Sequence, residues 1–450
     1  MVATTVATMV ASARLASAGP VAYVTNFGDG NVSMVDIETN AVRATIPLAT
    51  SPFGVAVAPS GARVYLTNPD DGSVAVLDPA AQTVVSTVTV GASPTGIAVD
   101  PSGQRLYVAN GGDGTITVLD ASTGAVLATV AVGARPFGVA ADQRRIYVTN
   151  SDDGTVSVLE SATNAIVATI TVGASPSAVA VDPAGTRVYV TNADDGTISV
   201  IDTASSRIIA TIPVGTSPSG VAVDPAGTRA YVANTCGTDT GCASFAGTVS
   251  VIDTATNTVA ATIAVDASPV GIAVDPDGTR VYVVNGCGAD ASCAFTGSTV
   301  SVVDTARDAV VATIPVGQGA VAFGKFIGAA PPALPVTTTT APPPSATTTT
   351  TLPCTTVGCL VETALTSGAC AGQSVPSAVT TEFDLAARLI AQAATSPPRR
   401  ARNLSRKAMK AVRQARTRTS TAAKKKTRLS PACAAALESV ADRVVAELRR

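Results

Sequence analysis

Short apolar segments separated by turn residues recur along the first two thirds of the chain. In one such unit, residues 175–215, the predicted strands are 178–181, 187–192, 197–201 and 207–214. Asp, Pro, Gly and Ser cluster between them, as expected of hairpin turns. Each unit is therefore predicted to form a four-stranded antiparallel sheet. The strands are apolar on both faces, which indicates a sheet packed between two neighbours.

Seven tyrosines mark the copies of this unit. Each begins the phrase YVTN or one of its variants YLTN, YVAN and YVVN, and the spacings between them are 42, 42, 40, 42, 42 and 51 residues. A fixed period near 40 predicts a repeat architecture in which each unit packs against the next. The seven are Tyr23, Tyr65, Tyr107, Tyr147, Tyr189, Tyr231 and Tyr282.

The first unit lacks the strand that introduces the other six. Only Gly19 and Pro20 stand where the Ser-Pro-x-Gly-Val-Ala-Val strand is expected before Tyr23. Residues 320–325 follow the last predicted fourth strand at 310–316, and we expect them to complete the first blade. The result is an all-β, seven-bladed β-propeller, closed at a junction that removes exposed sheet edges.

The YVTN strand, the SPxGVAVDPxGxR stretch before it and the DGTVSVID stretch after it resemble the YVTN family of seven-bladed β-propellers. The resemblance covers residues 20–328 and every unit. It implies the propeller fold and an exported or cell-surface protein of bacterial type. It does not imply a particular activity.

Composition removes several classes of site. The chain contains no histidine and no tryptophan, and aromatic residues make up 3%. Without histidine, the usual general base near neutral pH and the commonest ligand for zinc, copper and haem are missing. Few aromatic rings disfavour a stacking platform for sugars or single-stranded nucleic acid. We expect no cofactor and no nucleic-acid partner.

Most repeated polar residues are predicted to be structural. An Asn ends each tyrosine strand, and an Asp ends most third strands, where such side chains form turns. Arginines two residues before six of the tyrosines, such as Arg187, are expected to pair across the first hairpin with aspartates such as Asp182. A concerted anion site at these arginines is the less favoured alternative.

Aspartates also occupy the turn between the second and third strands. They predict a circle of carboxylates at one end of the ring, where Asp-Gly is usual in tight turns. A calcium site is the less favoured alternative, because no copy has the alternating Asp spacing of a dedicated calcium loop. Its candidate ligands are Asp70, Asp71, Asp113, Asp152, Asp153, Asp194 and Asp195.

Two adjacent units replace this turn by longer inserts, each nine residues longer than in the other units and each bounded by a C-x5-C pair. Disulfides Cys236–Cys242 and Cys287–Cys293 are expected to close them, since this spacing without His does not suit zinc. Function in repeat proteins often resides where the repeat is broken. The candidate partner-binding residues are Phe245, Phe295, Asp239 and Asp290; the alternative is that the inserts only cap the rim.

Three further segments flank the propeller. Residues 1–19 are expected to be a leader or the remnant of a signal peptide, and 329–353 a Pro/Thr-rich linker. Residues 354–450 carry 17 basic and 6 acidic residues, net +11, against 13 basic and 26 acidic, net −13, in residues 1–353. We expect this basic part to be a small α-helical module, with helices that include 381–394 and 405–416. Its stapling cysteines are Cys354, Cys359, Cys370 and Cys433, whose pairing stays open.

These features favour a secreted or cell-surface binding or scaffold protein without catalysis. The propeller is expected to present one face to a protein or polysaccharide, and the basic module to contact an anionic envelope polymer, the propeller or solvent. No transmembrane span is expected, since no later segment reaches about 18 uninterrupted apolar residues. The alternative is a lactonase-like hydrolase or lyase with a metal-assisted site at the channel mouth.

Overall fold

The computed structural model describes residues 19–48, 50–243, 245–288 and 297–332, together with 407–408, 410–414 and 417. The chain divides into two compact units, Met1–Thr338 and Thr339–Arg450. The predicted leader, the linker from residue 333 onward and most of the basic module lie outside the described residues.

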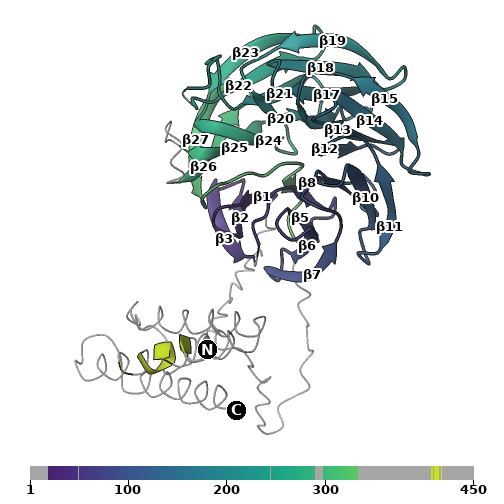
Figure 1. Cartoon of the computed structure of the whole chain (residues 1–450). Helices are drawn as coiled ribbons and strands as arrows, with labels where there is room; N and C mark the ends of the chain where they lie inside the picture. The colour runs from purple at the N-terminus through teal and green to yellow at the C-terminus, as the bar shows by residue number, and fades with distance from the viewer. Residues whose placement is uncertain are drawn as a thin grey trace, which may run out of the picture. The chain divides into compact units, whose positions relative to one another are not determined.

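The first unit is the predicted seven-bladed β-propeller, with four antiparallel strands in each blade (Figure 1). Blade 1 contains β28 (Ile327–Gly328), β1 (Val21–Asn26), β2 (Asn31–Asp36) and β3 (Ala41–Pro47). Blade 2 contains β4 (Val55–Val57), β5 (Val64–Asn68), β6 (Ser73–Asp78) and β7 (Thr83–Thr89). Blade 3 contains β8 (Pro94–Val99), β9 (Arg105–Asn110), β10 (Thr115–Asp120) and β11 (Val126–Ala131).

The remaining blades repeat this order. Blade 4 contains β12 (Pro136–Ala141), β13 (Arg145–Asn150), β14 (Thr155–Glu160) and β15 (Ile166–Thr171). Blade 5 contains β16 (Pro176–Val181), β17 (Arg187–Asn192), β18 (Thr197–Asp202) and β19 (Arg207–Pro213). Blade 6 contains β20 (Pro218–Val223), β21 (Arg229–Asn234), β22 (Thr248–Asp253) and β23 (Thr258–Ala264). Blade 7 contains β24 (Ala267–Val274), β25 (Arg280–Gly288), β26 (Ser298–Asp304) and β27 (Ala309–Val316).

The core lies between blades. The second and third strands of each blade are buried on both faces, which explains their continuous apolar pattern. One cluster joins Tyr107 and Val118 of blade 3 to Ile146 and Val148 of blade 4, and similar clusters follow around the ring. Each blade therefore buries its faces only against its neighbours, as the period predicted.

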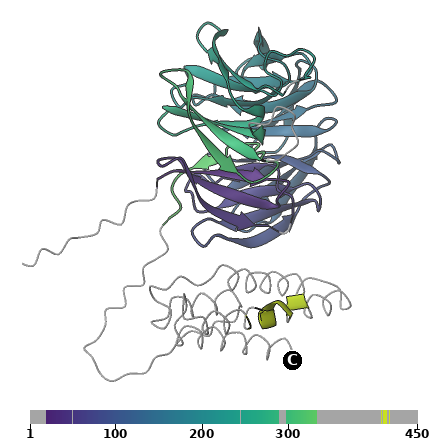
Figure 2. The same cartoon turned by 90° about the vertical axis from the view of Figure 1, so that its left-hand side faces the viewer.

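The C-terminal end of the propeller closes the ring, as expected. β28 pairs with β1 in an antiparallel register that places Ile327 opposite Ala22. Earlier in the same segment, Ala320 bridges Asn26. Figure 2 shows the green last blade beside the purple first blade. The regular pairing falls at β28, slightly later than the predicted residues 320–325.

Between these two contacts with blade 1, residues 323–325 pair with blade 2 instead. The carbonyl groups of Phe323 and Lys325 accept hydrogen bonds from the backbone N–H groups of Val55 and Val57, at 2.9 and 3.2 Å. Since Val55 and Val57 belong to β4, this part of the closing segment pairs with the inner strand of blade 2. The closing segment therefore joins two blades.

Five of the six repeated arginines contact the next blade, which differs from the predicted pairing. The sixth, Arg63, pairs with Asp78 of its own blade at 3.0 Å. Arg229 donates to the carbonyl of Thr305 in blade 7 at 2.9 Å and pairs with Asp308 there. Arg280 donates to the carbonyl of Ile37 in blade 1 at 3.0 Å. The expected hairpin partner of Arg229, Asp224, accepts instead from backbone N–H groups of its own turn. A turn offers several N–H donors at short range, so it satisfies the carboxylate without the arginine.

The two ends of the ring differ in their turns. The insert face carries the turns between second and third strands and the connections between blades. The proline face carries the turns between first and second strands, with Pro59, Pro101, Pro183, Pro225 and Pro276.

In the second unit, residues 407–408, 410–414 and 417 are helical. They fall in and just beyond the helix expected at 405–416. Ala408, Ala411 and Val412 are buried there. The helical residues within the described part of the chain do not form a segment with the length and apolar character of a membrane span.

Candidate functional site

The asparagines that end the tyrosine strands are buried cross-links. Asn150 donates from Nδ2 to the hydroxyls of Thr155 and Ser157 at 3.0 and 2.9 Å. Its Oδ1 accepts the backbone N–H of Gly133 at 3.1 Å. Gly133 lies in the connection from blade 3, so one side chain joins two strands and the preceding blade. This geometry assigns the asparagine a structural role.

One aspartate in each of three Asp-Gly turns is similarly engaged. Asp113, Asp153 and Asp195 each accept the backbone N–H of an alanine in the connection entering the same blade, at 2.6, 2.6 and 2.7 Å. In blade 2, Asp71 accepts the hydroxyl of Ser73 at 2.6 Å. The first three carboxylates therefore hold blade connections, whereas Asp71 bonds within its own blade.

The preceding aspartates of the same turns point to other partners. Asp152 lies 3.6 Å from Arg135, and Asp194 accepts the hydroxyl of Ser175. Asp70 lines a shallow depression between blades 1 and 2. All of these side chains are exposed on the insert face. Among the described residues, no three Asp, Glu, Cys or His side chains are grouped closely enough to hold a metal ion.

Aspartates at the ends of third strands form turns on the proline face. Asp120 accepts the hydroxyl of Ser122 at 2.7 Å and the backbone N–H of Thr123 at 2.8 Å. The hydrogen bonds from Ser122 and Thr123 lower the pKa of Asp120 to about 2. This carboxylate is thus a turn former held in its ionised state.

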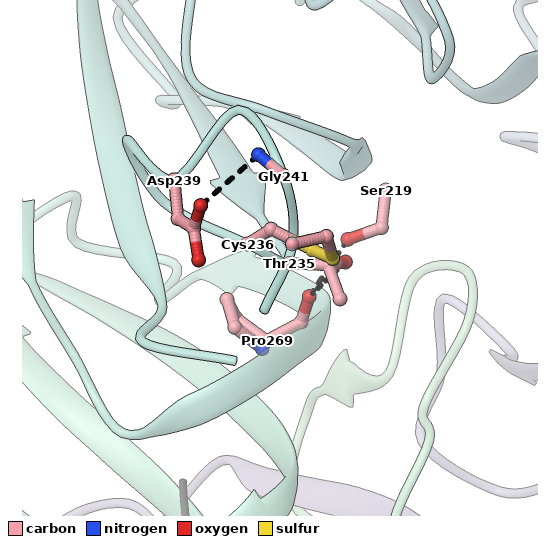
Figure 3. Close-up of a disulfide and its surroundings, with 7 residues drawn as sticks. Ser219, Thr235, Cys236, Asp239, Gly241 and Pro269 are labelled. Carbon is pink, nitrogen blue, oxygen red and sulfur yellow. Dashed lines mark hydrogen bonds between the residues drawn. A yellow bond between two sulfur atoms is a disulfide. The ribbon is translucent and has the colours of Figure 1, made fainter. Parts of the chain in front are cut away.

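The insert of blade 6 is a stapled, anchored loop (Figure 3). The predicted Cys236–Cys242 disulfide is present, and Cys236 is buried. Inside the staple, Asp239 accepts the backbone N–H of Gly241 at 3.0 Å. Thr235 donates to the carbonyl of Pro269 at 3.1 Å, so the loop base is fixed to the first strand of blade 7.

Two aromatic side chains lie on the insert face. Phe245 is half-buried, less exposed than its position in an insert suggested, and its carbonyl accepts the N–H of Ser268 at 2.9 Å. Phe27, in the blade 1 turn, is 38% exposed on the same face. Sequence reasoning passed over Phe27, although it replaces the polar or small residue found after the other strand-ending asparagines.

The second insert is only partly described. Cys287 is buried and disulfide-bonded. Its predicted partner Cys293 lies outside the described residues, as do Phe295 and Asp290. The same holds for Cys354, Cys359, Cys370 and Cys433.

A cavity occupies the centre of the ring. Its volume is about 610 Å³, and it is lined by the inner strands β4, β8, β12, β16, β20 and β24 and by residues 322–325 and 327–329. It reaches the prolines of the proline face. Phe323 also lines it and packs against Phe53 and Phe137, with ring centroids 6.0 and 4.9 Å apart.

Sequence reasoning missed this aromatic cluster, although a signal was present. Phe53 and Phe137 fill the variable position of the SPxG phrase, which holds Thr95, Ser177 or Ser219 in three other copies and Val270 in the last. The hydroxyl of Ser219 donates to the carbonyl of Pro269 in the next blade at 2.8 Å. Substitution of such a hydroxyl by phenylalanine marks a break in the repeat.

Comparisons with known proteins give one family match and several structures of similar fold. The model of the Choice-of-anchor I domain family matches residues 3–216. Hydrazine synthase of Kuenenia stuttgartiensis is 20% identical with a TM-score of 0.55, and the alignment covers 67% of this chain and 99% of that one. A functionally unknown protein of Desulfotomaculum acetoxidans is 14% identical with a TM-score of 0.56, covering 69% and 99%. No curated protein matches the chain. At these identities the two structures show a shared propeller fold and nothing of the chemistry.

Proposed function

We propose that this protein is an extracytoplasmic, surface-associated binding protein that recognises a protein or polysaccharide through its insert face. The observation that carries the proposal is the stapled blade 6 loop, which breaks the repeat and is anchored to blade 7. A loop held by a disulfide and backbone hydrogen bonds loses little conformational entropy on binding. It therefore suits recognition better than a free loop of the same length.

Three blades contribute to the proposed surface. Blade 6 supplies the loop with Phe245, blade 7 carries the second insertion, and blade 1 supplies exposed Phe27. These blades are consecutive around the closed ring, so their turns share one sector of the insert face. Aromatic rings with a polar surround are typical of the centre of protein interfaces.

The location is supported by independent features. Disulfides persist in oxidising compartments outside the cytoplasm, and the described part of the chain contains Cys236–Cys242. The family model that matches residues 3–216 is named for anchored domains. Membership of the YVTN family, suggested by the tyrosine phrases, belongs to the same proposal. The basic C-terminal module is proposed to contact an anionic envelope polymer.

A turn graft tests the proposal. In blade 5, four residues, 193–196, connect Asn192 to Thr197, whereas 13 residues, 235–247, connect the equivalent Asn234 to Thr248. Replacing 235–247 by Ala-Asp-Asp-Gly removes the loop while keeping a turn that this fold accepts. Blade 4 already carries Ser-Asp-Asp-Gly at 151–154, so its graft is the single change Ser151→Ala, and it is the control because no insert is lost there.

Both variants and the native chain would be used as bait against the extracellular fraction of the source cells. We expect the native chain and the blade 4 graft to capture the same partner, and the blade 6 graft and Phe27→Ala to lose most of it. Equal capture by the blade 6 graft would refute the role of the insert face. Recovery of the untagged protein only from the cytoplasm would refute the location.

A further inference from the structure

The central cavity has an apolar wall that is open to small molecules. On five inner strands, the last residue is aliphatic and half-exposed rather than buried: Val99, Ala141, Val181, Val223 and Val274. All five line the cavity of about 610 Å³. Small-molecule sites commonly enclose roughly 300–1,000 Å³ with mostly apolar walls and few polar groups. The cavity fits this description.

The closing segment is bent into this cavity. Ala322 has a φ of 76° and Gly324 a φ of 120°, and a positive φ is uncommon for alanine. The bend interrupts the pairing with blade 1 and directs residues 323–325 to β4. Unusual backbone of this kind persists where the surrounding structure enforces it, and it is concentrated at functional sites.

The bend places one aromatic ring and one cation at the cavity. Phe323 is 6% exposed and packs with Phe53 and Phe137, toward the insert-face end of the inner strands. Lys325 is exposed and lines the cavity. It is the first lysine of the chain, and the next is Lys407. The propeller therefore places its sole lysine at its central cavity.

The two carboxylates at the same cavity are committed to their own turns. Asp275 accepts from the N–H and hydroxyl of Thr279 at 2.8 and 3.0 Å and from the N–H of Arg280 at 3.1 Å. Asp100 accepts from the hydroxyl of Ser102 and from two backbone N–H groups. Within the described residues, Lys325 forms no ion pair. An ammonium beside an apolar wall is suited to an anionic head group on an apolar body.

We infer that the central cavity binds a small amphipathic carboxylate, with its head group on the Lys325 ammonium and its alkyl body against the aliphatic wall. A medium-chain fatty acid such as decanoate has this chemistry, and it is smaller than the cavity of about 610 Å³. This inference goes beyond the proposed function, because it concerns a different ligand and the opposite face of the ring.

Titration calorimetry of the full chain with decanoate tests the inference, with decanol as the uncharged probe. We expect saturable binding of decanoate, weakened about tenfold or more in Lys325→Gln by loss of the charge-assisted hydrogen bond. Decanol binding should be the same in both proteins. Lys407→Gln, which removes an exposed lysine outside the propeller, is the matched control and should bind decanoate normally.

A second variant locates the ligand. Val181→Asp adds a carboxylate to the cavity wall at a half-exposed position, and it should abolish decanoate binding while its urea unfolding stays cooperative. Absence of saturable decanoate binding to the native chain, or an affinity of Lys325→Gln within twofold of native, would overturn the inference. Normal binding by Val181→Asp would do the same. The blade 6 graft should still bind decanoate, so failure here is distinct from failure of partner capture.

Discussion

Replacement of Asn150 by alanine tests whether the strand-ending asparagines are structural. The side chain is buried and makes three hydrogen bonds, to Thr155, Ser157 and Gly133. A net contribution of about 1 kcal/mol for each bond predicts a loss of about 3 kcal/mol, within a range of roughly 2–4 because Ser157 is left buried without this partner.

Urea unfolding of the full chain followed by tyrosine fluorescence measures this loss. All seven tyrosines lie in the propeller and the chain has no tryptophan, so the signal reports the propeller alone. Gln143→Ala, at an exposed turn position of the same blade, is the control and should change the free energy of unfolding by less than about 0.5 kcal/mol. If Asn150→Ala cost no more than this control, the structural assignment of the repeated asparagines would be wrong.

Three further outcomes follow from the close approach of neighbouring blades, the burial of the tyrosines and the disulfide of the blade 6 loop. Gly138→Ala should destabilise by about 1–3 kcal/mol in urea unfolding, because a Cβ at Gly138 would lie 2.4 Å from the carbonyl oxygen of Ser177 in the next blade; stability equal to native would contradict this close approach. Burial raises the pKa of Tyr147 to about 12. The free energy of unfolding should therefore keep the whole contribution of this buried tyrosine below pH 10 and fall by roughly 2–3 kcal/mol per such tyrosine as the pH rises toward 12. Tyrosinate absorbance that appears before unfolding would contradict this pH dependence. Cys236→Ser with Cys242→Ser should cost at most about 2 kcal/mol, given the short loop, yet speed proteolysis at the insert; unchanged cleavage would mean that the staple does not hold the loop.

The repeat predicted the fold because its signal is redundant. Seven copies of one phrase report the same strand order, and the observed β17 (Arg187–Asn192) matches the predicted bounds. The closing strand was placed less well, since it occurs once and departs from the repeated phrase. The closing segment pairs with blade 1, then with blade 2, and then with blade 1 again. This order depends on contacts between distant residues, which no local sequence pattern predicts.

The partners of charged residues were harder to predict than the elements that carry them. The pairing of Arg229 with its own hairpin looked reasonable from spacing alone, yet the guanidinium reaches Asp308 in blade 7, 79 positions along the chain. Sequence spacing indicates which residues can share a turn, but it does not indicate which residues of a neighbouring blade an arginine side chain contacts. The candidate sites show the same limit. The inserts could be recognised in the sequence by their extra length, whereas the positions of the Phe323 cluster and of Lys325 follow from the bend in the closing segment, which the sequence did not predict.

A seven-fold ring limits where a specific site can arise. A residue present in every blade is presented seven times in equivalent surroundings, so it cannot by itself define one orientation of an asymmetric ligand. In this propeller the repeated Asn, Asp and Arg side chains are largely occupied by bonds within or between blades, such as Asn150 to Gly133. The groups left for recognition are those absent from most blades: the stapled loop, Phe27, and the Phe323 and Lys325 pair of the closing segment. Because the first set lies on the insert face and the Lys325 cavity reaches the proline face, the two proposed sites share no residue, and a variant of one should leave binding at the other unchanged.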